Sequence, residues 1–130
     1  MNQFVEVRKS EKQGEGLFTL RDFVKGESVY SLKRGRIVNY DEIRNLSEDE
    51  RAHLDQIGEN EYEIMEPPAR YINHSCEPNV EEKDRTGYAL GNIKKSEEIT
   101  IDYDKIAYIE KPFKCRCGSK KCRGFVRGRK

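Results

Sequence analysis

The stretch RYINHSCEPN, residues 70–79, carries most of what the sequence reveals. Proline lacks a backbone donor and restricts the residue before it, so Pro78 keeps this stretch from forming a helix. Its asparagines and its histidine offer directional hydrogen bonds, and Cys76 offers a soft metal ligand. Two interpretations stay open from these residues alone: a loop that holds a ligand, or a turn around a buried cysteine.

Three further motifs accompany this stretch along the chain. GEGLF lies at residues 14–18, EEITIDY at residues 97–103 and KCRCGSKKCRGF at residues 114–125. Glycine adopts positive φ and lets a ligand approach the backbone closely, so the turn at residues 14–16 is either an ordinary hairpin turn or a binding turn. An ordinary turn would explain one motif alone, and it is the set of four that indicates a functional site.

Taken in this order, the motifs resemble those of the SET-domain protein-lysine methyltransferases. RYINHSCEPN is similar to the family's RFxNHSCxPN, EEITIDY to its GEELTxDY, CRCGSKKC to its post-SET C-x-C-x4-C, and GEGLFTLRDFVKGESV to its opening GxGxFAxxxIxxGExI. The resemblance implies a mainly β fold, with small sheets around a knot-like C-terminal crossing, few short helices and a post-SET zinc site. It divides the chain into a SET domain at residues 1–110 and a post-SET zinc-binding segment at residues 111–130.

The resemblance also implies that S-adenosylmethionine is the cofactor. In the family the glycine-rich turn presents its backbone to this molecule, and the asparagine and the histidine hold its adenine and its amino end. Carried over residue by residue, the expected cofactor contacts are Gly14, Glu15, Gly16, Arg70, Tyr71, Asn73, His74, Tyr103 and Phe113. For His74 a structural role in fixing the loop competes with direct contact, and neither role makes it a general base.

Tyr103 is the predicted catalytic residue. Methyl transfer from a sulfonium to an amine is an in-line displacement, which needs alignment more than a strong base. The lysine must arrive neutral although its unperturbed pKa is about 10.4, and a dry channel beside the positive sulfonium lowers that pKa. A tyrosine hydroxyl next to the methyl group can then orient the amine. The alternative is a tyrosine that only packs in the core, and Glu98 and Asp102 are expected to be structural.

All four cysteines of the chain belong to these motifs: Cys76, Cys115, Cys117 and Cys122. Four thiolates with this short spacing suit a tetrahedral zinc site, which would hold the C-terminal segment against the active site. Two disulfides suit a cytosolic chain less well, since a single residue separates Cys115 from Cys117. The remaining alternative is four reduced thiols without a metal.

The chain departs from the family's pattern where the lysine channel is expected. The early channel tyrosine has no clean match, because Lys33 stands at its place and Tyr30 lies nearby. Ile101 occupies the position two before Tyr103, where the family commonly has tyrosine or phenylalanine. Isoleucine cannot donate a hydrogen bond and leaves room beside the amine, so the resemblance favours di- or trimethylation. Residues 40–68, where the family builds part of its peptide groove, are few and charged.

Composition limits the classes of partner. The formal net charge is +1 over 130 residues, which predicts no strong attraction to nucleic acid or to an anionic membrane, and the basic residues 120–130 are interpreted as a solvated tail. No stretch is apolar enough to span a bilayer, and no secretion signal begins the chain. We therefore expect a cytoplasmic protein, or a nuclear one if it is eukaryotic or delivered to a host cell, that acts on a lysine of a histone or of another protein. The alternative function is a zinc-stabilised binding module that has kept the fold and lost turnover.

Local patterns predict one helix among many short strands. The helix is expected over residues 46–57, with Ser47 as its N-cap, Glu50 as the capping-box partner and Gly58 as its stop. Residues 99–102 alternate apolar and polar side chains, as a half-buried strand does.

Two hairpins are also expected from the turn residues. The first joins residues 28–32 to residues 36–39 through the Arg-Gly pair at 34–35, and the second joins residues 80–82 to residues 88–92 around the Thr-Gly pair at 86–87. Both predictions rest on glycine, which adopts the backbone conformations that tight turns require.

Overall fold

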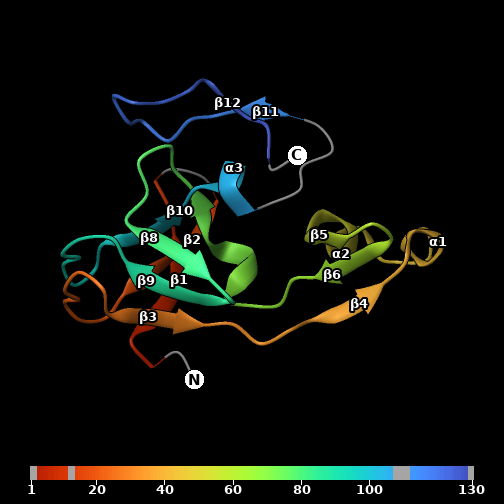
Figure 1. Cartoon of the computed structure of the whole chain (residues 1–130), viewed down its shortest axis with the longest axis horizontal. Coiled ribbons are helices and arrows are strands. Elements are labelled where there is room, and N and C mark those ends of the chain that lie inside the picture. The colour runs from red at the N-terminus through yellow and green to blue at the C-terminus, as the bar shows by residue number, and fades with distance from the viewer. Residues whose placement is uncertain (1–2, 12–13, 107–111, 129–130) are drawn as a thin grey trace.

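The computed structural model of the chain describes residues 3–11, 14–106 and 112–128. Short strands form four small sheets, and the helices are short as well, as Figure 1 shows. The expected mainly β fold of small sheets is confirmed, and the knot-like crossing stays a prediction. The expected boundary between residues 110 and 111 lies outside the described residues. Within the described part of the chain, no helix has the length and apolar character needed to cross a membrane.

The central sheet has four strands in the order β1-β2-β10-β7. These are β1 (Val5–Lys9), β2 (Glu15–Thr19), β10 (Glu98–Ile101) and β7 (Asn73–His74). β10 runs antiparallel to β2 and parallel to β7, and it pairs Thr100 with Asn73 and Ile101 with His74. The sheet therefore brings three sequence motifs that lie far apart along the chain onto neighbouring strands.

Three further sheets lie in the described part of the chain. The order β3-β9-β8 is formed by β3 (Ser28–Ser31), β9 (Thr86–Ala89) and β8 (Val80–Lys83). The order β4-β6-β5 is formed by β4 (Arg36–Val38), β6 (Glu61–Ile64) and β5 (Leu54–Gly58). Near the C-terminus, β11 (Phe113–Lys114) pairs with β12 (Phe125–Val126).

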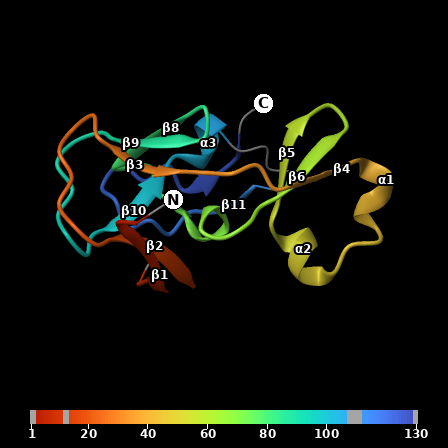
Figure 2. The same ribbon diagram turned by 90° about the horizontal axis from the view of Figure 1, so that it is seen from below.

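The β4-β6-β5 sheet and the helices α1 (Tyr40–Ile43) and α2 (Glu48–Ala52) form a lobe at one end of the molecule, as Figures 1 and 2 show. The lobe has a small core of its own, built on Val38, Leu46 and Ile64. The main core is a separate cluster that gathers side chains of the central sheet and the β3-β9-β8 sheet, with Leu17, Phe23, Tyr30, Ile93 and Ile99 among its largest buried members. A boundary lies between these two cores, and part of the candidate site lies along it.

The predicted helix over residues 46–57 is wrong in its second half. Ser47 caps α2 as expected, because its hydroxyl accepts from the Glu50 N–H and the Glu50 carboxylate accepts from the Ser47 N–H. α2 is short, however, and Leu54 already begins β5, so Gly58 ends a strand instead of a helix. β5 finds its backbone partner in β6, and Leu54 packs on the lobe's core. Pairing with a later strand outweighs the local helical pattern.

The predicted hairpin from residues 28–32 to residues 36–39 is also wrong. β3 pairs with β9 and β4 pairs with β6, so the chain crosses from one sheet to another between β3 and β4. Gly35 marks the crossing, because a Cβ there would overlap the carbonyl oxygen of Ile64 at the end of β6. Glycine is needed at this position for the close approach of two backbones, and not for a hairpin turn.

The second predicted hairpin exists, but its turn lies earlier than expected. β8 and β9 join through Asp84 and Arg85, whose φ values of 54° and 68° are those of a two-residue hairpin turn. Gly87 lies inside β9, where a Cβ would overlap the ring of Tyr30. This glycine makes room for a core side chain, a role that sequence alone does not distinguish from a turn.

Candidate active site and metal centre

A small hollow of about 70 Å³ lies where β7, α3 (Tyr103–Ile106) and the cysteine-rich segment meet. It is lined by Asn73, His74, Tyr103, Phe113, Cys115, Arg116 and Cys117. The first four of these are among the predicted cofactor contacts. The fold thus brings residues from two distant motifs and from the cysteine-rich segment to one place.

Asn73 ties the glycine-rich turn to this hollow. Its side-chain amide nitrogen donates to the carbonyl oxygen of Glu15 at 2.9 Å and to Oε2 of Glu98 at 2.8 Å. The same carboxylate accepts a hydrogen bond from the hydroxyl of Ser10 at 2.7 Å. A Cβ on Gly16 would overlap the Glu98 carboxylate, so the turn lies as close to β10 as only glycine permits. The turn therefore lies beside Asn73, and Glu98 anchors both.

His74 links the small hollow to the cysteines. Its buried ring accepts a hydrogen bond at Nδ1 from the backbone N–H of Tyr103, at 3.0 Å, and its Nε2 lies 3.4 Å from Sγ of Cys76. With Nδ1 as the acceptor, the proton of the neutral ring is assigned to Nε2. Burial lowers the pKa of His74, although the carboxylate of Asp102 lies 3.8 Å from Nδ1 and opposes this. The neutral ring positions the backbone of Tyr103.

Tyr103 begins α3 with its ring against His74, and the ring centroids are 5.3 Å apart. Its hydroxyl donates a short hydrogen bond to the carbonyl oxygen of Ile72. Burial, helped by the charge of Glu98, raises the pKa of Tyr103 to about 12. The hydroxyl is therefore protonated near neutral pH. Because its proton is directed at Ile72, its lone pairs remain to accept a hydrogen bond from a ligand.

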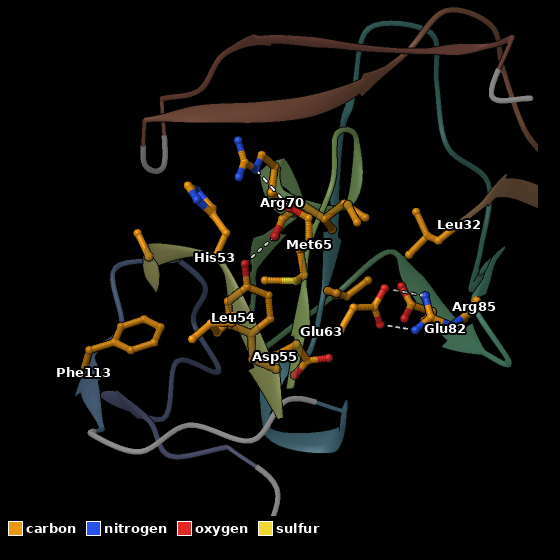
Figure 3. Close-up of a pocket in the computed structure, with 15 residues that line it drawn as sticks. Leu32, His53, Leu54, Asp55, Glu63, Met65, Arg70, Glu82, Arg85 and Phe113 are labelled. Atoms are coloured by element: carbon orange, nitrogen blue, oxygen red, sulfur yellow. Dashed lines mark hydrogen bonds and ion pairs between the residues drawn. The ribbon is translucent and has the colours of Figure 1, made fainter. Parts of the chain in front are cut away.

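A larger cavity of about 450 Å³ also reaches Tyr103 (Figure 3). It lies between the lobe and the rest of the fold, and its walls come from β5 and β6 on one side and from β8, β10 and the 3₁₀ turn η1 (Ala69–Tyr71) on the other. Tyr103 and Phe113 line both this cavity and the small hollow. A ligand in the hollow and a ligand in the cavity would therefore meet at Tyr103.

Five predicted cofactor residues do not line the small hollow, and Gly14, Glu15 and Gly16 of the glycine-rich turn are three of them. Arg70 lines the larger cavity, where its Nε donates to the carbonyl oxygen of Met65 at 3.2 Å and its guanidinium pairs with Asp49 at 3.2 Å. Tyr71 is half-buried in η1 and lines neither space. The structure places Arg70 on the cavity side of the site.

Near Lys33, where the channel tyrosine was expected, an aliphatic side chain lines the larger cavity. Leu32, and not its neighbour Lys33, lines the larger cavity. Tyr30 is buried in the main core, and its hydroxyl donates to Glu82 at 2.9 Å. Among the described residues that line the cavity, Tyr103 is the only tyrosine.

The four cysteines form one cluster. Their sulfur atoms all lie within 4.8 Å of one another, and the sulfurs of Cys76 and Cys115 are 3.7 Å apart. A tetrahedral site with Zn–S bonds of about 2.3 Å separates its sulfurs by about 3.8 Å, so the donors and their spacing fit zinc. Burial acts to raise the pKa of Cys117, but the backbone N–H groups of Cys76 and Ser119 and the neighbouring thiols lower it to about 6. Cys117 therefore favours the thiolate, the form that binds a metal, whereas burial raises the pKa of Cys76 and raises that of Cys115 to about 12.

Arg123 is a site residue that the sequence did not single out. Its guanidinium binds both carboxylate oxygens of Asp102, at 2.7 and 3.1 Å, and pairs with Asp104 at 2.9 Å. Its backbone N–H donates to Sγ of Cys76 at 3.3 Å. The basic stretch was interpreted as a solvated tail, and for Arg123 that interpretation is wrong. The only signal was its place directly after Cys122, which ties it to the cluster.

Comparison with known proteins gives the family. Residues 14–104 match the SET domain, which is well over half of the chain. The chain belongs to the SET-domain family. The match ends at Asp104, before the cysteine-rich segment, so the SET domain includes the turn at residues 14–16, the Asn73–His74 strand and Tyr103.

Several curated proteins are similar to this chain. The chain is 33% identical over 138 residues to the histone-lysine N-methyltransferase trithorax of Drosophila virilis, which covers 95% of this chain and 4% of that protein. It is 32% identical over 142 residues to an H3 lysine-36 specific histone-lysine N-methyltransferase of Coccidioides immitis, covering 96% of this chain and 14% of that protein. It is 29% identical over 141 residues to human histone-lysine N-methyltransferase SETD2, covering 95% of this chain and 6% of that protein. The chain thus spans a small fraction of the length of these relatives.

Proposed function

We propose that this SET domain transfers a methyl group from S-adenosylmethionine to the ε-amine of a lysine in a protein. The observation that carries the proposal is that Tyr103 lines both the small hollow and the larger cavity. A two-substrate transfer needs its donor and its acceptor on either side of one aligning group. The names of the relatives, which are histone-lysine methyltransferases, support the same reaction.

The small hollow is the proposed place for the methyl-bearing end of the cofactor. S-adenosylmethionine would supply an electrophilic methyl group carried on a positive sulfur. Asn73, His74 and Phe113 would bind it, together with the backbone of the glycine-rich turn that Asn73 holds in place. These residues hold a ligand by shape and by backbone hydrogen bonds, since the Asn73 amide nitrogen already bonds to Glu15 and Glu98.

The larger cavity is the proposed channel for the substrate lysine. Its wall next to Tyr103 is aliphatic, with Leu32, Ile72 and Ile101, which suits the methylene chain of a lysine. The hydroxyl of Tyr103 accepts an N–H of the amine, because its own proton is directed at Ile72. That contact aligns the nitrogen with the methyl group and keeps water away from it.

The cysteine cluster is the proposed zinc site, and its role is to position the segment that closes the small hollow. Phe113, Cys115 and Cys117 line that hollow, so a metal held by the cysteines fixes part of its wall. Structural zinc contributes directly to the stability of the segment that binds it.

The test uses the wild-type chain, S-adenosylmethionine with a labelled methyl group, and a set of proteins and peptides that contain lysine. We expect label on lysine, located at the ε-nitrogen by mass spectrometry, and saturable cofactor binding by titration calorimetry. Cofactor binding without any transfer would favour a module that has lost turnover. Absence of both binding and transfer would refute the proposed function.

A further inference from the structure

Glu82 is a carboxyl group in the wall of the larger cavity, on β8 (Figure 3). Along this strand Val80 is buried and Glu82 half-buried, whereas Glu81 and Lys83 are exposed, as in a strand with one covered face. A carboxylate on a covered face costs free energy unless another group compensates its charge. Its presence in the proposed lysine channel needs an explanation that packing does not supply.

One oxygen of this carboxylate is held by the core. The hydroxyl of Tyr30 donates to Oε1 of Glu82 at 2.9 Å, and Gly87 makes room for the tyrosine ring. Within the described part of the chain, this is the only hydrogen bond made to the Glu82 carboxylate. Oε2 is therefore left to accept from a molecule in the cavity.

The neighbouring Glu63 lacks this capacity. Arg85 binds both of its carboxylate oxygens, and the Gly35 N–H donates to Oε2 at 2.5 Å. Burial acts to raise the pKa of Glu63, but the contacts with Arg85 and Gly35 lower it overall. Both carboxylate oxygens of Glu63 therefore already have partners. Arg85 is bound to Glu63 and not to Glu82.

The surroundings of Glu82 raise its pKa, whereas those of Glu63 lower the pKa of that residue. Burial raises the pKa of Glu82, and the charge of Glu63 adds to this increase. The hydrogen bond from Tyr30 and the charge of Arg85 oppose it without cancelling it. Glu82 is therefore a more basic carboxylate than an exposed one.

Glu82 also lies close to the catalytic end of β10. It shares the wall of the larger cavity with Ile101, and the same two residues line a further hollow of about 220 Å³. Ile101 comes two residues before Tyr103 in the chain. A lysine whose nitrogen reaches Tyr103 through the cavity therefore enters a space that Glu82 also lines.

We propose that Glu82 is the base that takes a proton from the substrate ammonium before methyl transfer, an inference that rests on the proposed function. The lysine enters as an ammonium, because its unperturbed pKa is about 10.4. Tyr103 cannot take this proton, since its hydroxyl is protonated and directed at Ile72. The aliphatic walls formed by Leu32 and Ile101 offer no acceptor.

The proton transfer balances without any further reactant. One N–H bond of the ammonium breaks, an O–H bond forms at Oε2 of Glu82, and the electrons of the broken bond become the amine lone pair. The amine then turns toward the methyl group, and its lone pair forms the N–C bond as the C–S bond breaks. The sulfur leaves as a neutral thioether, the product is a methylated ammonium, and Glu82 releases its proton to water through the cavity.

Two other titratable side chains in the cavity wall are placed less well for this role. Nδ1 of His53 lies 2.8 Å from the carbonyl oxygen of Asp49, whose exposed carboxylate also pairs with Arg70, so His53 belongs to the rim. Asp55 on β5 already interacts with another group. His53 serves as the comparison variant in the test.

The test compares kcat/KM of Glu82→Gln and wild type from about pH 6 to about pH 10 on one lysine peptide. Glutamine keeps an oxygen for the Tyr30 hydroxyl and cannot take the proton. We expect a loss of about 100-fold near neutral pH, which shrinks as pH rises because solvent then deprotonates the amine. Glu81→Gln, the same change on the exposed face of β8, should match wild type.

A second variant tests the assignment from the other direction. Tyr30→Phe keeps the carboxylate but removes the hydrogen bond that lowers its pKa, so the acid limb of the wild-type pH profile should move to higher pH. Unfolding temperature and cofactor affinity, measured on each variant, separate these effects from loss of fold.

Several results would overturn the inference. These are wild-type kcat/KM in Glu82→Gln, a loss that is equal at every pH, an unmoved acid limb in Tyr30→Phe, or the pH-dependent loss appearing in His53→Gln instead. If the wild-type chain transfers methyl groups, such a result refutes the role of Glu82 alone. If the wild-type chain transfers none, the proposed function fails with it.

Discussion

Ile101 shows how a single side chain bears on the product of the proposed reaction. It is buried at the end of β10, it lines the larger cavity, and Tyr103 follows two residues later. An isoleucine offers the amine no hydrogen bond and so does not hold it in one orientation. An amine that already carries a methyl group can therefore turn and present its lone pair again.

Ile101→Tyr should shift the product toward monomethyl-lysine. The added hydroxyl would hold the amine, and the added bulk would occupy the part of the cavity into which methyl groups turn. Mass spectrometry of a lysine peptide at long reaction times measures the distribution. Ile101→Phe adds the ring without the hydroxyl and separates the two contributions. An unchanged methyl count in Ile101→Tyr would remove the reason for expecting di- or trimethylation.

At the residue scale, the sequence was enough to single out side chains with unusual chemistry. It was not enough to find residues whose role depends on partners that are distant in the sequence. Asn73, His74 and the cysteines stand out because amide, imidazole and thiol side chains are grouped in short motifs. Arg123 and Glu82 are ordinary charged residues in a chain rich in charge. Their importance comes from Asp102 and Tyr30, which lie far away in the sequence and meet them only in the fold.

At the scale of elements, the pairing of strands was harder to predict than the capping of a helix. Capping chemistry is local, so the start of α2 at Ser47 was predicted correctly. Strand pairing is not a local property, and the local pattern of residues 46–57 predicts a helix because it does not reveal that β5 pairs with β6. Gly35 and Gly87 were both interpreted as turn residues, although each accommodates another group of the fold.

Arg123 helps to hold the segment that follows Cys122 to the SET domain, together with the backbone N–H groups of Arg127 and Gly128, which donate to Asp104. The guanidinium of Arg123 binds the buried carboxylate of Asp102 and also pairs with Asp104 at the start of α3. Removal of the guanidinium leaves that buried carboxylate with fewer hydrogen bonds, which typically costs about 1–3 kcal/mol. Since Arg123 is itself partly exposed, we expect the lower part of that range.

Arg123→Ala should therefore lower the free energy of unfolding in urea and increase hydrogen exchange over residues 112–128. Arg123→Lys keeps the charge but not the bidentate contact with Asp102, so this variant should be more stable than Arg123→Ala but less stable than wild type. Lys121→Ala, at an exposed position in the same segment, is the matched control. Equal stability of the Arg123→Ala and Lys121→Ala variants would show that the ion pair does not hold the segment.

At the scale of the whole molecule, the central sheet forms one wall of the small hollow and the cysteine-rich segment forms another. Cys76 comes from the motif after β7, whereas Cys115, Cys117 and Cys122 come from the C-terminal segment that carries β11 and β12 (Figure 1). A metal at this cluster would join two regions that are distant in sequence. The order of the motifs was enough to predict the family, but the pairing of β7 with β10 and the lobe on its own core became visible only in the fold.

We expect one zinc ion per chain in protein purified without chelators, as measured by elemental analysis. Removal of zinc, or Cys117→Ser, should weaken cofactor binding and increase hydrogen exchange over residues 112–128, because that segment supplies Phe113 to the small hollow. The lobe should keep its protection, since its core does not include the cysteines. A well-folded chain that contains no zinc and binds the cofactor normally would contradict the metal assignment.

The central claim of this account is that methyl donor and amine acceptor meet at the hydroxyl of Tyr103. The most direct measurement is therefore the comparison of Tyr103→Phe with wild type, for both methyl transfer and S-adenosylmethionine affinity, in matched preparations. The ring remains against His74 in this variant, and only the oxygen is lost. We predict that transfer falls by about ten- to a thousand-fold, the scale of one positioned hydrogen bond, and that cofactor affinity changes little. Normal transfer with weakened cofactor binding would contradict the claim, because it would make Tyr103 a wall of the small hollow and not the group that aligns the amine.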